Sequence, residues 1–204
     1  MQMIKIPRSP SDVSLDWLND SIATFARTSR RLIAFEMSES PQGQSSTTRR
    51  IRVTWAEGDS GSLFLKMLNP LAPFIELHRK MGVYHTEVGF YKQVREVGLR
   101  VPNCHVAEVD PITQAFVLLL EDVGPGRSLM NLDDAELAIV NLARFHSQWW
   151  DNEDLQSQSW LGKPRARCLQ TIQTAKTVMA TIRENPELEL LIDGEAREAL
   201  TLLF

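Results

Sequence analysis

A lysine stands in the middle of an otherwise apolar run, where its charge needs a partner. The run is SLFLKML, residues 62–68, and the lysine is Lys66. If the run is a β-strand, Phe64, Lys66 and Leu68 share one face, and both faces of the strand are apolar. An ammonium there loses hydration worth several kcal/mol unless a counter-charge or a ligand replaces the water. The alternative is that the strand lies at an edge of the sheet and the side chain of Lys66 reaches solvent.

A glutamate is in the same situation on the helix predicted at residues 84–97. At about 100° per residue, Glu87 falls near the centre of a broad apolar face. That face comprises Tyr84, Val88, Phe90, Tyr91, Val94 and Val97. We therefore predict that Lys66 pairs with Glu87. The pair would either fix the helix on the sheet or hold the lysine so that its ammonium can meet phosphate oxygens.

A third candidate feature is the end of an apolar run at residues 116–123, FVLLLEDV. The run stops at Glu121 and Asp122 and enters a Gly-Pro-Gly turn. This leaves a short extended segment where a strand-rich part of the chain meets a helix-rich part. Junctions of this kind often form ligand clefts.

The elements that must position these residues follow from the hydrophobic periodicity. Ser or Asp before the apolar-periodic segment from Val13 to Ile22 predicts a capped N-terminal helix. Apolar runs separated by turn-forming residues predict three sequential antiparallel strands and two later strands: 31–37, 49–55, 62–68, 101–109 and 114–123. After the segment GPGRS, residues 124–128, the composition is helical, apart from breakers near Pro164 and Pro186. The order predicts an α+β protein.

Composition excludes several classes of function. The chain has 204 residues, 43% of them hydrophobic, and a formal net charge of -4, which argues against a nucleic-acid partner. No long apolar N-terminal segment or transmembrane window is present, so we expect a cytoplasmic protein with no membrane partner. Cys104 and Cys168 lack the spacing of a zinc site or a disulfide framework.

Taken together, these segments resemble the aminoglycoside-phosphotransferase-like kinases, in the branch that contains the ecdysteroid kinases. The resemblance covers about residues 10–150 and is carried by SLFLKML, HTEVGFYKQV, VPNCHVAEV, FVLLLEDV and ELAIVNLARFHSQWW. It implies a protein-kinase-like N-terminal lobe, an antiparallel sheet plus one helix, at residues 1–123. Residues 124–204 would then be the first helices of an incomplete helical C-terminal lobe.

The resemblance also implies a nucleotide site with ATP as the cofactor. Lys66 would contact the α and β phosphates, and Glu87 would orient it. The segment from Glu121 to Val123 would bind the edge of the adenine through backbone groups. The residues leave open whether the nucleotide is ATP or GTP.

The loop SPQGQSSTT, residues 40–48, would lie over the phosphates. Gly43 would give it flexibility, and Ser45 or Ser46 would supply a hydroxyl or backbone donor. The loop is not a GxGxxG, and an ordinary polar hairpin turn explains its composition equally well.

Three further features are better explained by packing than by chemistry. His146 faces the apolar side of a helix predicted from Asp133 to Trp150, which is typical of a hydrogen-bonded structural histidine. The pair Trp149 and Trp150 is typical of core packing. LIDGE, residues 191–195, resembles a metal-binding aspartate after a strand, but its surroundings are helical and no catalytic loop precedes it.

The catalytic part of such kinases is absent from the sequence. Phosphoryl transfer there uses an HGDxxxxN motif and a second aspartate for Mg²⁺, and none of the four histidines is followed within two residues by an aspartate. We expect no catalytic residue and no metal ligand in this chain, with Mg²⁺ bound only together with a missing C-terminal part. The chain is then expected to be the N-terminal portion of a longer kinase.

Two hypotheses for the function remain. In the first, a longer parent transfers the γ-phosphate of ATP to a hydroxyl of a small molecule, and this chain is its nucleotide-binding half. In the second, the chain is a non-catalytic nucleotide-binding or protein-interaction module built on a degenerate kinase lobe. An incomplete helical lobe would expose apolar surface, so self-association is a further expectation. The class of acceptor stays open.

Overall fold

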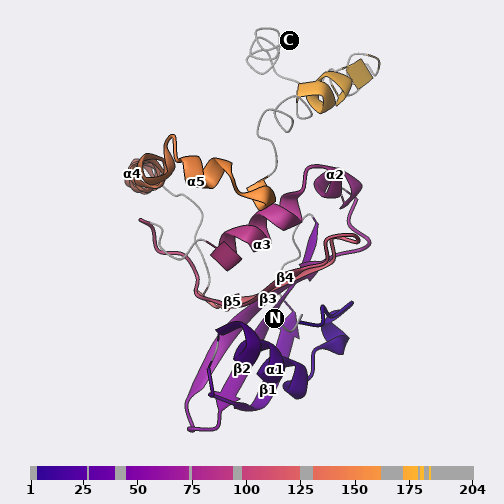
Figure 1. Cartoon of the computed structure of the whole chain (residues 1–204), viewed down its shortest axis with the longest axis vertical. Coiled ribbons are helices and arrows are strands. Elements are labelled where there is room, and N and C mark those ends of the chain that lie inside the picture. The colour runs from indigo at the N-terminus through magenta and orange to yellow at the C-terminus, as the bar shows by residue number, and fades with distance from the viewer. Residues whose placement is uncertain are drawn as a thin grey trace. The chain divides into compact units, whose positions relative to one another are not determined.

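The structure is a computed structural model, and it divides the chain into two compact units, residues 1–161 and 162–204. The residues it describes are 4–26, 28–39, 45–73, 75–93, 98–124, 131–161, 172–178, 180–181 and 184. The first unit contains the sheet and the helices α1 to α5 (Figure 1). In the second unit, the described residues are helical.

The N-terminal segment forms the capped helix that the sequence predicts. A 3-10 turn, Pro10–Asp12, precedes helix α1, Leu15–Ala26. The hydroxyl of Ser14 accepts a hydrogen bond from Trp17 N, 3.1 Å away, and so satisfies one of the free N–H groups of the first turn. Leu18 and Ile22 are one turn apart and are both buried, which places one stripe of α1 against the sheet.

Five antiparallel strands form one sheet in the order β1-β2-β3-β5-β4. They are β1 Leu32–Glu39, β2 Ser46–Trp55, β3 Ser60–Leu68, β4 Cys104–Val109 and β5 Phe116–Glu121. The predicted α+β class and the three sequential antiparallel strands are confirmed. Strand β4 begins three residues later than predicted.

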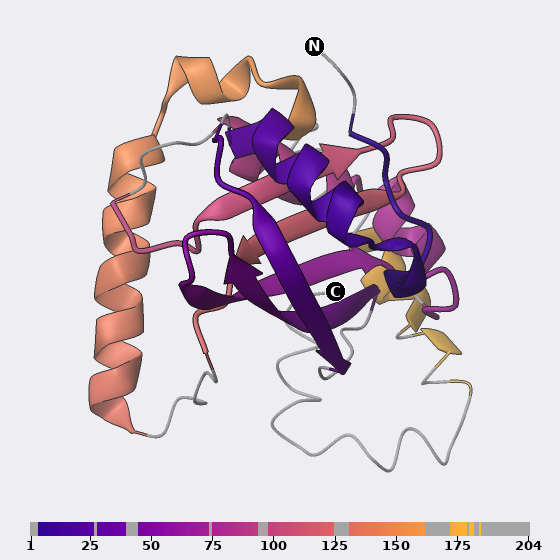
Figure 2. The same cartoon turned by 90° about the horizontal axis from the view of Figure 1, so that it is seen from below.

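Helices cover both faces of the sheet. On one face, Leu18 and Ile22 of α1 pack against a cluster that includes Leu63 and Leu65 of β3. On the other face, helix α3, Val83–Gln93, packs its Tyr84 and Val88 against Leu118 and Leu120 of β5. Figures 1 and 2 show the sheet between α1 and α3. Strand β5 is buried on both faces, which explains its uninterrupted apolar run.

Helix α3 follows a short helix that the sequence analysis did not predict. This helix is α2, Ile75–Lys80. It ends where Gly82 adopts a φ of 62°, in the left-handed region that favours glycine, and Gly82 N donates to Arg79 O. The predicted helix at 84–97 is observed as far as Gln93, and residues 94–97 lie outside the described part of the chain.

A tryptophan from a later turn fixes α3 from the side. Trp160 belongs to the 3-10 turn Ser159–Leu161 and is buried against α3 at Gly89. The backbone oxygen of Trp160 accepts a hydrogen bond from the hydroxyl of Thr86 at 3.1 Å. The absence of a side chain at Gly89 permits this approach, because a Cβ there would lie 2.5 Å from the Cβ of Trp160.

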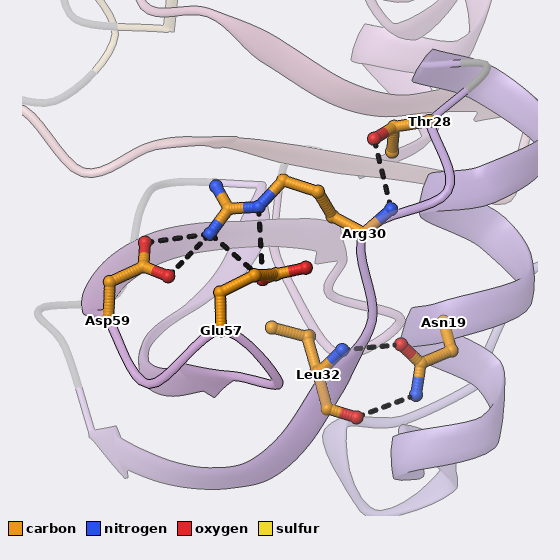
Figure 3. Close-up of polar contacts among 6 residues, drawn as sticks. All are labelled: Asn19, Thr28, Arg30, Leu32, Glu57 and Asp59. Atoms are coloured by element: carbon orange, nitrogen blue, oxygen red, sulfur yellow. Dashed lines mark hydrogen bonds and ion pairs between the residues drawn. The ribbon is translucent and has the colours of Figure 1, made fainter.

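Polar contacts of two residues join α1 to the first residue of β1 and the segment before β1 to the turn between β2 and β3 (Figure 3). The buried side chain of Asn19 accepts from Leu32 N and donates to Leu32 O, at 2.7 and 3.0 Å. The exposed guanidinium of Arg30 contacts Asp59 and Glu57 and lies 4.3 Å from the ring centroid of Trp55. Asn19 thus joins α1 to β1 in the interior, and Arg30 joins the segment before β1 to the β2–β3 turn at the surface.

The chain after residue 130 continues as α4, Leu132–Trp149, and α5, Glu153–Gln156. Asn131 caps α4 by accepting a hydrogen bond from Asp134 N at 2.9 Å. The predicted bounds of α4 were one residue too late at each end. Large apolar side chains of this helix are exposed, among them Leu132, Leu137, Ile139 and Leu142. The lobe boundary after residue 123 stays a prediction.

Candidate functional site

Strand β3 presents Lys66 on an inner position of the sheet. The residue lies opposite Thr48 of β2 on one side and Leu118 of β5 on the other. The alternative that Lys66 belongs to an edge strand is therefore wrong. Its neighbours Phe64 and Leu68 on the same face pack against the cluster beneath α3, so the lysine emerges from an apolar surface.

Lys66 forms the predicted pair with Glu87 of α3. The distance from Lys66 Nζ to Glu87 Oε1 is 2.5 Å, and the two side chains are 27% and 28% exposed. Each charge thus has a partner on the protein side and access to solvent on the other. Because an ammonium carries three N–H donors and Glu87 takes one of them, further acceptors such as phosphate oxygens can bind from the solvent side.

A tyrosine on the next turn of α3 adds to the surroundings of Glu87. Burial raises the pKa of Tyr91, and electrostatic interaction with Glu87 and then with Cys104 raises it further. The phenol therefore stays neutral at physiological pH. Its ring packs against the cluster beneath α3 and contacts the ring of Phe90, with centroids 5.3 Å apart.

At the end of β5, the side chain of Glu121 is held by the segment that precedes β4. Asn103 donates to Glu121 Oε2 from both its backbone N and its side chain, at 3.1 and 3.0 Å, and Arg100 donates to Oε1 at 3.2 Å. These hydrogen bonds, with that from Asn103 N the largest cause, lower the pKa of Glu121. The carboxylate of Glu121 is thus bound to Arg100 and Asn103. A ligand at the segment from Glu121 to Val123 would therefore contact its backbone groups and not this carboxylate.

The next residue, Asp122, forms a second charged cluster that the sequence analysis did not single out. Its side chain is 7% exposed. Asp122 Oδ2 lies 2.5 Å from Arg50 Nε and 2.6 Å from Ser62 Oγ, and its Oδ1 accepts from Gly124 N at 3.0 Å. The Asp-x-Gly sequence indicates a local turn, but no periodicity in the sequence links Asp122 to an arginine 72 residues earlier.

The Asp122 cluster lies on the same face of the sheet as Lys66. Arg50 is opposite Phe64, and Phe64 is opposite Leu120, so the alternate positions 62, 64 and 66 of β3 share this face with position 50 of β2. A pocket of about 140 Å³ adjoins the cluster, with lining residues Glu36, Met37, Ser38, Arg50, Arg52 and Ser62. This pocket is smaller than the several hundred Å³ of a typical ligand site.

Only part of the predicted phosphate loop is described. Gly43 lies outside the described residues, and Ser45 precedes β2 and accepts a backbone hydrogen bond from Asn69 N. Ser46 is the first residue of β2, buried opposite Leu68. The predicted loop at 40–48 was therefore too long at its C-terminal end, because its last three residues pair with β3. A role of Ser45 or Ser46 in phosphate binding stays a prediction.

His146 and Trp150 are exposed, so the expectation that these two residues pack in a core is wrong. Val123, in the segment expected to bind the base, is exposed as well. No cluster of three or more His, Cys, Asp or Glu side chains suited to a metal ion occurs in the described ranges. Over the same described ranges, no helix has the length and apolar content to cross a membrane.

Comparisons of the chain with protein-family models, with curated proteins and with solved structures found no match in any of the three.

Proposed function

We propose that this chain is the nucleotide-binding part of an ATP-dependent small-molecule phosphotransferase. The observation that carries the proposal is the contact of Lys66 on an inner strand with Glu87 on α3, with both side chains open to solvent on one side. Protein kinases hold the α and β phosphates with a lysine of the third strand, paired with a glutamate of the helix that follows. The same two residue types occupy the same kinds of element here.

The strand order supports the same proposal. Lys66 on β3 and the exit of β5 are neighbours because β3 pairs directly with β5. In a kinase-like lobe, this brings the phosphate-binding lysine and the base-binding segment from Glu121 to Val123 to one face of the sheet. Among the residues that the structure describes, none accepts a hydrogen bond from Val123 N. This N–H is suited to bind the edge of a base.

Calorimetric titration of ATP into the chain, with and without Mg²⁺, tests the proposal. Lys66→Ala should weaken binding about tenfold or more, because it removes a charge-assisted contact to phosphate. Lys92→Ala is the matched control, since Lys92 also lies on this side of the fold and pairs with Glu108 at 2.6 Å with a similar exposure of 28%. Equal binding by all three proteins, or none by the unmodified chain, would contradict the proposal.

The second candidate function is a non-catalytic interaction module, and exposed apolar side chains of α4 favour it. Leu132, Leu137 and Ile139 are all more than half exposed. Leu132 and Ile139, seven residues apart, lie on one side of the helix, and exposed apolar surface is typical of contact sites. Sedimentation over a range of concentrations separates the candidates, because association without ATP binding would favour the module, and ATP binding by a monomer would favour the phosphotransferase part.

A further inference from the structure

Asp122 joins three segments through one buried carboxylate. Its oxygens contact Arg50 of β2 at 2.5 Å and Ser62 of β3 at 2.6 Å, and accept from Gly124 N at 3.0 Å. The backbone takes part as well, because Asp122 N donates to Ser62 O at 3.3 Å. The end of β5 is therefore tied to the two neighbouring strands and to its own continuation.

The carboxylate stays charged despite its burial. Burial acts to raise the pKa of Asp122, but the hydrogen bonds from Ser62, Arg50 and Gly124 and the charge of Arg50 outweigh it and lower the pKa. At neutral pH, Asp122 is thus an anion whose acceptor sites are occupied by fixed donors. Charge-assisted hydrogen bonds of this kind are about twice as strong as neutral ones.

These contacts fix the backbone on both sides of Val123. Residue 122 is held by its hydrogen bonds to Ser62, and residue 124 by the hydrogen bond from its N–H to Asp122. Gly124 has a φ of 80°, which a residue with a side chain rarely adopts. Val123 is held between these two points with its side chain exposed.

We propose that Asp122 is a positioning residue that holds the segment from Glu121 to Gly124 in the conformation that binds the base of a nucleotide. This inference rests on the proposed function. Ser62 and Lys66 are four residues apart on β3, which corresponds to ~13 Å along a strand. The end of the site near Ser62 would therefore hold the base, and the end at Lys66 would hold the phosphates. Asp122 would then affect the binding of the base and not the binding of the phosphates.

The test compares three probes by calorimetry: ATP, adenosine and inorganic tripolyphosphate. Asp122→Asn should weaken the binding of ATP and of adenosine about tenfold and leave the binding of tripolyphosphate unchanged. The reason is that the loss of the charge weakens several hydrogen bonds that hold the segment from Glu121 to Gly124. Ser62→Ala, which keeps the ion pair with Arg50, should have the same selectivity and a smaller effect. Lys66→Ala should weaken the binding of ATP and of tripolyphosphate and leave the binding of adenosine unchanged.

Arg52→Gln is the matched control. Arg52 lies two residues from Arg50 on β2, and its contact with Glu36 is fully open to solvent, with side chains 78% and 79% exposed. It should bind all three probes like the unmodified chain. Unchanged adenosine binding by Asp122→Asn, or an equal loss for adenosine and tripolyphosphate, would overturn the positioning role.

Amide hydrogen exchange separates this inference from the proposed function. Asp122→Asn should accelerate exchange at the amides of residue 122 and Gly124, which donate to Ser62 O and to the Asp122 carboxylate, relative to Arg52→Gln. An unchanged rate at both amides would overturn the inference whether or not nucleotide binds. If the unmodified chain binds none of the three probes, the proposed function fails and the assignment to a base fails with it. Faster exchange in that case would still support Asp122 as the residue that positions this segment.

Discussion

Lys66 Nζ lies 2.5 Å from Glu87 Oε1, and this contact joins an inner strand of the sheet to the helix that covers it. Both charges emerge from apolar surroundings, since Phe64 and Leu68 flank the lysine and Val88 follows the glutamate. Each group therefore supplies the partner that the other would lack. The contact links the packing of α3 directly to the geometry of the proposed nucleotide site.

A double-mutant cycle should measure this coupling. Lys66→Ala and Glu87→Ala are expected to show an interaction free energy of about 1 kcal/mol, as partly exposed ion pairs do. Urea unfolding of the two single variants, the double variant and the unmodified chain gives the value. The cycle of Lys92→Ala with Glu108→Ala is the matched comparison on the same helix. Strict additivity at Lys66 and Glu87 would show that the contact contributes nothing to stability.

Gly89→Ala should destabilise the protein even though alanine favours helices. The added Cβ would lie 2.5 Å from the Cβ of Trp160, so the turn at 159–161 must move. We expect a net loss of about 1–3 kcal/mol, since overpacking outweighs the gain in helix propensity of about 1 kcal/mol. In a Trp160→Ala background the sign should reverse, because the clash is gone. Thermal unfolding of the four proteins checks this, and a stabilised Gly89→Ala single variant would contradict it.

Asn19→Ala should cost about 2–3 kcal/mol, because it leaves the buried N–H and C=O of Leu32 without their partner. Both groups bond to the amide of Asn19 in the structure (Figure 3). Asp20→Ala is the control, since Asp20 is on the exposed side of the same helix. Urea unfolding of both variants measures the difference, and equal stability of the two would refute the role of Asn19 in joining α1 to β1.

The stability of the fold should fall between pH 7 and pH 5, in part because of His105. Burial lowers the pKa of His105 from 6.5, and the nearby charge of Glu121 opposes this only in part. The unfolded chain therefore binds a proton at a higher pH than the folded chain, so stability is lost as the pH falls below about 6.5.

His105→Gln should flatten this part of the pH profile of unfolding free energy. His146→Gln is the control, because His146 is exposed on α4. If His105→Gln retained the full slope of the unmodified chain, burial of this histidine would not be the cause.

The periodicity of the sequence determined the strands, α1 and α3, because alternating and helical patterns record which side of each element is buried. It also predicted α4, although no side chain of that helix, Leu132–Trp149, is buried. The sequence pattern also determined the pairing of Lys66 with Glu87, since two opposite charges that lie on apolar faces of a strand and of a later helix have few other partners. The helix α2 was missed because its six residues, IELHRK, carry too short a pattern to distinguish a helix from a turn.

Only the tertiary structure decided the contacts between distant segments. Asp122 meets Arg50 because β5 lies beside β3 and β3 beside β2, and the register of these pairings sets which side chains share a face. Gly89 meets Trp160 because a turn far along the chain packs on α3. Such contacts depend on strand order and on the close approach of backbones, and no local pattern of side chains encodes either.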